Sequence, residues 1–179
     1  FDKTDGSIHT LTKFTLPNVN RVHSINGIVK SNKGWYIGFW DGVWFLENGS
    51  EKLVKTDMSH SLFAMTKDRY QPIIWIGTDS NGLIKWSNED ASVNCITYDN
   101  LPYYIEMPVR CLYMDKHNGL WFGTKGNGLF HIKDFHLSSK YDETNTDRYN
   151  TSNSKLIDNN VYCLTQSSLK EGVFIGTEG

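Results

Sequence analysis

The stretch "WIGTDSNGL", Trp75 to Leu83, recurs almost unchanged at Trp121 to Leu129 as "WFGTKGNGL". Weaker copies stand at Tyr36 to Val43, "YIGFWDGV", and at Phe174 to Gly179, "FIGTEG". Four related segments within 179 residues indicate an internal repeat. A repeat of this kind determines the fold class, so its period and its elements are the first features to establish.

The glycine shared by the four copies gives the period. Gly38, Gly77, Gly123 and Gly176 are 39, 46 and 53 residues apart, close to the period of about 40–50 residues of β-propeller blades. A triplet of apolar and aromatic residues precedes each glycine, as in "IWI" and "LWF". These segments are too short, and too rich in aromatic and β-branched residues, for helices. The repeat is therefore expected to consist of strands.

A turn dipeptide follows the glycine in the three complete copies: Asp41-Gly42, Asn81-Gly82 and Asn127-Gly128. Asp-Gly and Asn-Gly are the preferred pairs for two-residue type I′ turns, in which both central residues have a positive φ. Another apolar run leaves each turn, as "VWFL", "LIKW" and "LFHI". Each copy is therefore predicted to form a β-hairpin with a type I′ turn.

Two more strands complete the predicted unit. Upstream of each glycine lies a run that is apolar on both faces, such as "SLFAMT" or "VRCLYM", as expected for an inner strand covered from both sides. A more polar run, such as "KLVKT", ends the unit. Four antiparallel strands repeated at this period are typical of propeller blades. The predicted fold is an all-β propeller fragment built from four-stranded antiparallel blades.

These patterns divide residues 1–179 into parts of one propeller. We expect the outer strand of a preceding blade at 7–15, three blades at 20–57, 60–99 and 108–142, and a partial blade at 160–179. Residues 138–160 are polar and are interpreted as an insertion with an outer strand near its start. Because the chain starts with Phe1 and stops inside a repeat, we expect it to be a piece of a larger propeller. Its open ends would be covered by the remaining blades or, in a homodimer, by a second copy.

Composition narrows the classes of partner. Hydrophobic residues make up 39% and aromatic residues 13%, which is typical of a folded protein. The 18 basic and 20 acidic residues are mixed along the chain, so neither a nucleic acid partner nor direct membrane contact is expected. Cys95, Cys111 and Cys163 each lie in an apolar run without metal-ligand spacing and are expected to be small buried hydrophobic residues.

Catalytic and cofactor motifs are absent from the sequence. It contains no G-x-S-x-G elbow and no phosphate-binding or dinucleotide-binding pattern. The segment "DKHNG" at Asp115 lacks the ligand spacing of a calcium loop. His117, His131 and His136 are divided between a strand and two loops, so we expect scattered surface histidines rather than a metal site. No catalytic residue, metal or cofactor is predicted.

The repeated residues are interpreted as structural. Trp75, Trp121, Tyr36 and Phe174 occupy one position of the repeat and are expected to be buried between neighbouring sheets rather than to bind sugar. A recurrent glycine within a strand allows close approach of another backbone. The glycines interpreted in this way, or as turn residues, are Gly38, Gly77, Gly123, Gly176, Gly42, Gly82 and Gly128.

The repeat resembles that of the two-component regulator propeller family, whose pattern is D-x-x-G-x-L-W-I-G-T followed by a Gly-rich turn. Residues 115–128, "DKHNGLWFGTKGNG", and 73–86, "IIWIGTDSNGLIKW", carry the resemblance. The connections "TLPNVNRVHSI" and "NLPYYIEMPVRCL" resemble the family's Leu-Pro linkers. Two copies depart from the pattern, with "GFWDG" in the first and "DRYQP" in the second.

The resemblance implies a periplasmic sensor region of a hybrid two-component system of the Bacteroides type, a protein anchored in the inner membrane. In this family the propellers precede a membrane helix and a histidine kinase. It implies a ligand-sensing fragment without catalytic activity of its own, with an oligosaccharide or another small molecule as ligand. Two other functions remain open, namely a propeller enzyme of the lyase or glycosidase type and a platform for protein–protein interaction.

Residues that differ between the copies are the candidates for ligand binding. If each inner strand begins at the top face of the propeller, the turns between second and third strands and the connections between blades share that face. Aromatic and polar groups converging there would suit a sugar. The predicted ligand-binding residues are Trp40, Asp41, Asp79 and Asn81 on the turns and Arg21, Tyr103, Tyr104 and Glu106 on the connections.

Overall fold

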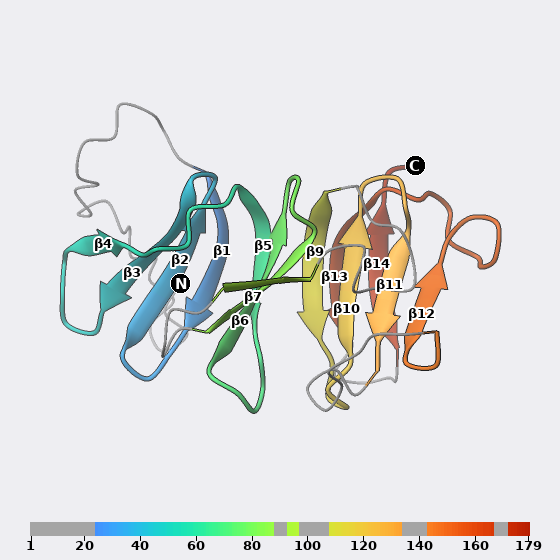
Figure 1. Cartoon of the computed structure of the whole chain (residues 1–179). Coiled ribbons are helices and arrows are strands. Elements are labelled where there is room, and N and C mark those ends of the chain that lie inside the picture. Colours follow the sequence, from blue (N-terminus) through green and yellow to red (C-terminus); the bar gives the residue numbers. More distant parts are fainter. Residues whose placement is uncertain (1–23, 88–92, 97–107, 134–142, 167–171) are drawn as a thin grey trace, which may run out of the picture.

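The computed structural model describes residues 24–87, 93–96, 108–133, 143–166 and 172–179 (Figure 1). All regular structure within these ranges is β-strand, which confirms the all-β prediction. The expected strand at 7–15 lies outside the described residues. So do residues 20–23, at the start of the first predicted blade, and residues 97–99, at the end of the second.

Four antiparallel sheets follow one another along the chain, and in each the strands are neighbours in sequence order. The first contains β1 (Ile25–Lys30), β2 (Gly34–Phe39), β3 (Gly42–Glu47) and β4 (Leu53–Lys55). The second contains β5 (Leu62–Lys67), β6 (Ile73–Thr78), β7 (Leu83–Ser87) and β8 (Val93–Ile96). The third contains β9 (Val109–Met114), β10 (Leu120–Thr124), β11 (Leu129–Ile132) and β12 (Thr146–Tyr149). The fourth contains the two described strands β13 (Val161–Gln166) and β14 (Val173–Thr177).

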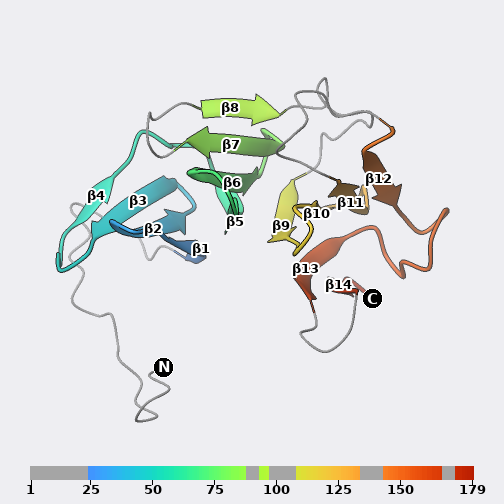
Figure 2. The same cartoon turned by 90° about the horizontal axis from the view of Figure 1, so that it is seen from below.

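The sheets are arranged as an arc (Figure 2). The first strand of each sheet lies on the inner side, and each of these strands packs beside the first strand of the next sheet. The fourth strands β4, β8 and β12 lie on the outer side. Radial repetition of four-stranded sheets around a centre is the architecture of a propeller.

The three predicted hairpins form, but their turns are not of type I′. Among the described residues the only non-glycine residue with a positive φ is Asn118, at 64°. Asp41, Asn81 and Asn127 therefore lack the positive φ that a type I′ turn requires at its first central residue. The glycines that follow them do have a positive φ, of 129° at Gly42, 63° at Gly82 and 86° at Gly128, as does Gly126 within the third turn at 95°.

The threonine of the repeat explains this difference. In the second sheet the N–H of Thr78 donates to the carbonyl oxygen of Gly82 at 3.0 Å. The N–H of Asn81 donates to the Thr78 hydroxyl at 2.8 Å, so the side chain caps a three-residue loop. Thr124 makes the equivalent bonds in the third sheet. The first sheet has Phe39 at this position, and there the connection contains only Trp40 and Asp41.

The fourth strand of the third sheet lies further along the chain than predicted. The sequence pattern ended this blade at 142, whereas β12 is formed by residues 146–149, inside the segment interpreted as an insertion. This strand, "TDRY", pairs with β11 from Leu129↔Tyr149 to Ile132↔Thr146. As the edge strand of its sheet, β12 is mostly only partly buried, so its side chains can be polar. Its pairing with β11 is made by backbone groups and leaves no hydrophobic pattern in the sequence.

Most of the described core lies at the interfaces between consecutive sheets, and one further cluster, around Trp44, lies within the first sheet. Tyr36 of β2 packs toward Ile84 and Trp86 of β7, and Trp75 of β6 packs toward Phe122 and Phe130 of the third sheet. Trp75 is 1% exposed and Tyr36 is 8% exposed.

The prediction that Phe174 is buried is wrong. Its side chain is 62% exposed, and Trp121 is only half-buried. Each residue at this position of the repeat packs toward the following sheet, and among the described residues no sheet follows β13 and β14.

Two expectations about single side chains also need correction. Cys111 is buried, which raises the pKa of its thiol to about 12, but Cys163 is exposed. The side chain of Cys95 lies outside the described part of the structure. His131 is largely buried against Trp121 rather than on the surface, His117 is exposed, and His136 lies outside the described residues.

Candidate ligand-binding site

Each inner strand contains a β-bulge at the same place. In β5, Leu62 pairs with Thr78 and Ala64 pairs with Gly77, so Phe63 has no partner on β6. The same shift occurs in β1, β9 and β13. Bulges redirect a side chain and are common next to functional sites. The four bulge residues are Asn26, Phe63, Arg110 and Tyr162.

The bulge residues of neighbouring sheets contact one another. The guanidinium carbon of Arg110 lies 5.4 Å from the centre of the Phe63 ring and 4.8 Å from that of Tyr162. Phe63 also packs edge-on against Trp40, with their ring centres 5.2 Å apart. We call these four residues, Trp40, Phe63, Arg110 and Tyr162, the bulge row. It crosses all four sheets.

Backbone contacts explain why Trp40 joins this row. In the first and third sheets the turn after the second strand contacts the chain that enters the next sheet. The N–H of Val43 donates to the carbonyl oxygen of Met58 at 2.9 Å, and the N–H of Gly128 donates to that of Asn159 at 2.9 Å. The turns between second and third strands and the starts of the next inner strands therefore meet at one end of the sheets.

The bulge row is exposed at both ends and is polar at its Tyr162 end. Trp40 is 46% exposed and Tyr162 is 40% exposed, while Phe63 and Arg110 are partly buried. The hydroxyl of Tyr162 donates to Oε2 of Glu178 at 3.1 Å, and this bond raises the pKa of the phenol. Asn26 holds the start of β5 through a 2.7 Å bond from Nδ2 to the carbonyl oxygen of Leu62.

The structure brings one of the predicted binding residues into the row, namely Trp40. Asp41 forms an ion pair with Lys55 at 2.9 Å. Asp79 and Asn81 lie on the β6–β7 turn at the same end of the sheets. The other four predicted residues, Arg21, Tyr103, Tyr104 and Glu106, lie outside the described residues.

Phe63, Arg110 and Tyr162 were missed by the sequence analysis. Their signal is present, because the bulge position differs in every copy while the residues around it repeat an apolar pattern. An arginine inside the apolar run "VRCLYM" is the clearest case.

A second polar group, around Asp115, is structural. Oδ1 of Asp115 accepts the N–H groups of His117 and Gly119, both at 2.8 Å, and Oδ2 accepts the indole N–H of Trp121 at 2.9 Å. Burial by itself raises the pKa of Asp115, but these hydrogen bonds outweigh it and the net pKa is lowered. His131, 3.3 Å away, stacks on Trp121. The carboxylate is occupied by structural hydrogen bonds, so it is not a candidate catalytic base.

The second sheet contains the same hydrogen-bonded arrangement around Asp68, although its sequence departs from the family pattern. Oδ1 of Asp68 accepts the N–H groups of Tyr70 and Gln71, and Oδ2 accepts the indole N–H of Trp75 at 3.2 Å. The Asp-to-Trp hydrogen bond is therefore a shared structural element of the two repeats.

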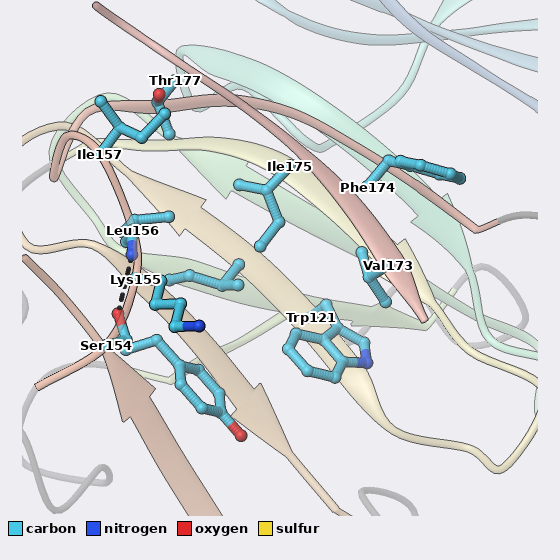
Figure 3. A pocket seen from close by; sticks show the side chains of 11 residues that line it. Trp121, Ser154, Lys155, Leu156, Ile157, Val173, Phe174, Ile175 and Thr177 are labelled. Carbon is cyan, nitrogen blue, oxygen red and sulfur yellow. Dashed lines mark hydrogen bonds between the residues drawn. The ribbon is translucent and has the colours of Figure 1, made fainter. Parts of the chain in front are cut away.

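A hollow of about 540 Å³ lies between the third and fourth sheets. It is lined mainly by apolar residues, and Figure 3 shows Val173 and Ile175 pointing toward Trp121 while the Phe174 ring is directed away. Between the first and second sheets the equivalent space is filled by the third strand of the second sheet, whose residues Ile84 and Trp86 pack against Tyr36. This hollow is therefore a packing surface between sheets rather than a candidate ligand site.

Within the described residues, no group of three or more metal-ligating side chains comes together. The same residues include no helix long and apolar enough to cross a bilayer.

Comparison with known proteins agrees with the sequence resemblance. Residues 103–126 match the family model described as two component regulator propeller. No relative of curated function matches the chain in sequence.

Solved structures match a larger part of the chain than the family model does. The extracellular domain of the putative hybrid two component system BT3049 from B. thetaiotaomicron is 29% identical, with a TM-score of 0.67. That match covers 87% of this chain and 20% of the other. The corresponding domain of BT4673 from the same organism is 16% identical with a TM-score of 0.64, over 86% of this chain and 20% of that chain. PorZ, a surface component of the type-IX secretion system of Porphyromonas gingivalis, is 19% identical with a TM-score of 0.63. That match covers 86% of this chain and 25% of the other.

These matches confirm the resemblance to the two component regulator propeller family and the fold class of a β-propeller fragment. The chain spans a fifth of the length of the two B. thetaiotaomicron domains.

Proposed function

We propose that this chain is part of an extracytoplasmic, non-catalytic propeller that senses an oligosaccharide for a hybrid two-component receptor, in the periplasm. The bulge row is the observation that carries the proposal. The likeness to BT3049, described as an extracellular domain of such a system, supports the receptor class. The family model at residues 103–126 supports it independently.

The chemistry of the bulge row suits a sugar. Trp40, Phe63 and Tyr162 supply aromatic surface for the C–H faces of a pyranose ring. Arg110, Glu178 and the Tyr162 hydroxyl supply polar groups for its hydroxyls. Aromatic walls combined with a few convergent polar groups are typical of small-ligand sites.

A glycosidase or lyase would need acidic groups that are available for proton transfer. Near the bulge row, Asp41 is paired with Lys55 and Glu178 accepts the Tyr162 hydroxyl. These engagements favour binding over catalysis among the described residues.

Further blades of the same protein are the proposed partners of the exposed apolar surface at the fourth sheet. Phe174, Ile175 and Ile157 are 62%, 40% and 77% exposed there. Surfaces of this kind are usually covered in native proteins. The greater length of the B. thetaiotaomicron domains supports additional blades as the cover, and a second copy in a homodimer is the alternative.

Calorimetric titration with a panel of oligosaccharides tests the function. We expect a member of the panel to bind, and Trp40→Ala to weaken its binding about tenfold. Trp35→Ala is the matched control, because Trp35 is 38% exposed near the start of β2, whereas Trp40 directly follows its end, and Trp35 lies outside the row.

Equal affinity of the Trp40→Ala variant and the wild type would contradict the assignment of the site. Cleavage of a sugar during the titration, detected by chromatography, would instead indicate the enzyme alternative.

A further inference from the structure

Within the part of the chain that the structure describes, Arg110 has no polar partner. Among the described residues no acidic side chain forms an ion pair with it, and it donates no hydrogen bond. Its Nε is shielded from solvent and has no acceptor. A guanidinium carries five N–H donors, and a buried donor is normally paired.

Two aromatic rings hold the guanidinium in place. Phe63 on the second sheet and Tyr162 on the fourth flank it at 5.4 Å and 4.8 Å from its central carbon. Such contacts orient a cation but use its π-face rather than its N–H groups. The N–H edge therefore has a defined direction and is not used within the described protein.

The nearby acidic groups are engaged elsewhere. Glu178 accepts the hydroxyl of Tyr162 at 3.1 Å, and Asp158 accepts the N–H of Asn160 at 2.6 Å. Neither of them forms an ion pair with Arg110. The positive charge of the bulge row is thus not neutralised by a partner carboxylate of the described chain.

We infer that Arg110 binds a carboxylate of the ligand, and that the sensed oligosaccharide contains a uronic acid. The inference rests on the proposed function and specifies its ligand class. A planar guanidinium and a carboxylate match in a bidentate pair, which is stronger and more directional than a bond to a neutral hydroxyl. The neighbouring rings would contact the sugar that carries the carboxylate.

Matched ligands test the charge directly. Calorimetric titrations of the wild type would use trigalacturonate and its methyl ester, and xylotriose with and without a glucuronic acid branch. We expect at least one acid to bind, and to bind about ten- to a hundredfold more tightly than its uncharged counterpart. Arg110→Gln should lose this preference, whereas Arg69→Gln, an exposed arginine on the β5–β6 turn, should keep it.

The outcomes separate the two proposals. Equal binding of an acid and its uncharged counterpart, or a preference that survives in Arg110→Gln, would overturn the carboxylate assignment and leave oligosaccharide sensing intact. Binding of a sulfated oligosaccharide while both acids fail would also overturn it. Failure of every sugar of the function panel to bind would overturn both proposals. The comparison of acid with ester needs only the wild-type protein, so it holds even if Arg110→Gln does not fold.

Discussion

The second and third sheets contain the same hydrogen bond from a tryptophan indole to an aspartate, but in two different surroundings. In the second, Asp68 accepts the indole N–H of Trp75, which is 1% exposed because apolar residues of β9, β10 and β11 in the third sheet cover it. In the third, Asp115 binds the indole of Trp121, which is half-buried against the two described strands of the fourth sheet. Burial of the repeat tryptophan therefore depends on the next sheet and not on its own hairpin.

The residue beside each tryptophan differs as well. Trp75 pairs across the strands with Lys85, whose ammonium lies 5.8 Å from the indole centre. Trp121 pairs with His131, which stacks on the indole with the ring centres 3.8 Å apart. The hairpin register is the same in both sheets, and only the chemistry of the neighbour has changed.

The largest expected effect comes from removing each tryptophan. Trp75→Ala should lower the free energy of unfolding by about 3–5 kcal/mol, because it empties a fully covered site. Trp121→Ala should cost about 1–2 kcal/mol, since part of the indole already faces the hollow. Urea denaturation followed by circular dichroism measures both. Equal losses would indicate that a further blade or a second copy covers Trp121 in solution.

An intermediate effect is expected from filling the space beside the motif glycines. A Cβ on Gly77 would lie 2.6 Å from the carbonyl oxygen of Val109 in the next sheet, which cannot turn aside. A Cβ on Gly176 would meet chiefly the sulfur of Cys163, a side-chain atom that can move away by a change of rotamer. Gly77→Ala should therefore cost about 1–3 kcal/mol, and Gly176→Ala should cost less in the same denaturation assay. The reverse order would contradict this account of the sheet interfaces.

The smallest expected effect is a pH dependence specific to the third sheet. Burial lowers the pKa of His131, and the opposing attraction of Asp115 does not restore it. The folded state therefore favours the neutral form of the His131 imidazole over the protonated form. The resulting contribution to stability is complete above the unfolded pKa of about 6.5 and is lost as the pH falls through the lowered folded value.

Free energies of unfolding at pH 7.5 and pH 5 measure this dependence. Over this range the wild type should lose more stability than His131→Gln. The range stays above the region near pH 4 where the lowered pKa of Asp115 would contribute. An identical loss in both proteins would show that His131 does not carry the effect.

The strands and hairpins could be predicted because their signals are local. Apolar triplets around Gly77 and Gly123 and the turn glycines Gly82 and Gly128 identify a hairpin from a few consecutive residues. The turn type was predicted wrongly because the Asn-Gly pair was considered without the threonine that caps the loop. Strand β12 was placed too early because a polar outer strand is defined by its pairing with β11 and not by hydrophobicity.

The sequence alone determined the repeat, its all-β character and the order of strands within each sheet, because these follow from side-chain pattern and turn residues along a single hairpin. The tertiary structure decided which residues meet. It placed Phe63, Arg110 and Tyr162 in one row although they come from three sheets, and it buried Trp75 while leaving Phe174 exposed. Both outcomes depend on the neighbouring sheet, whose position is set by packing between strands far apart in the chain.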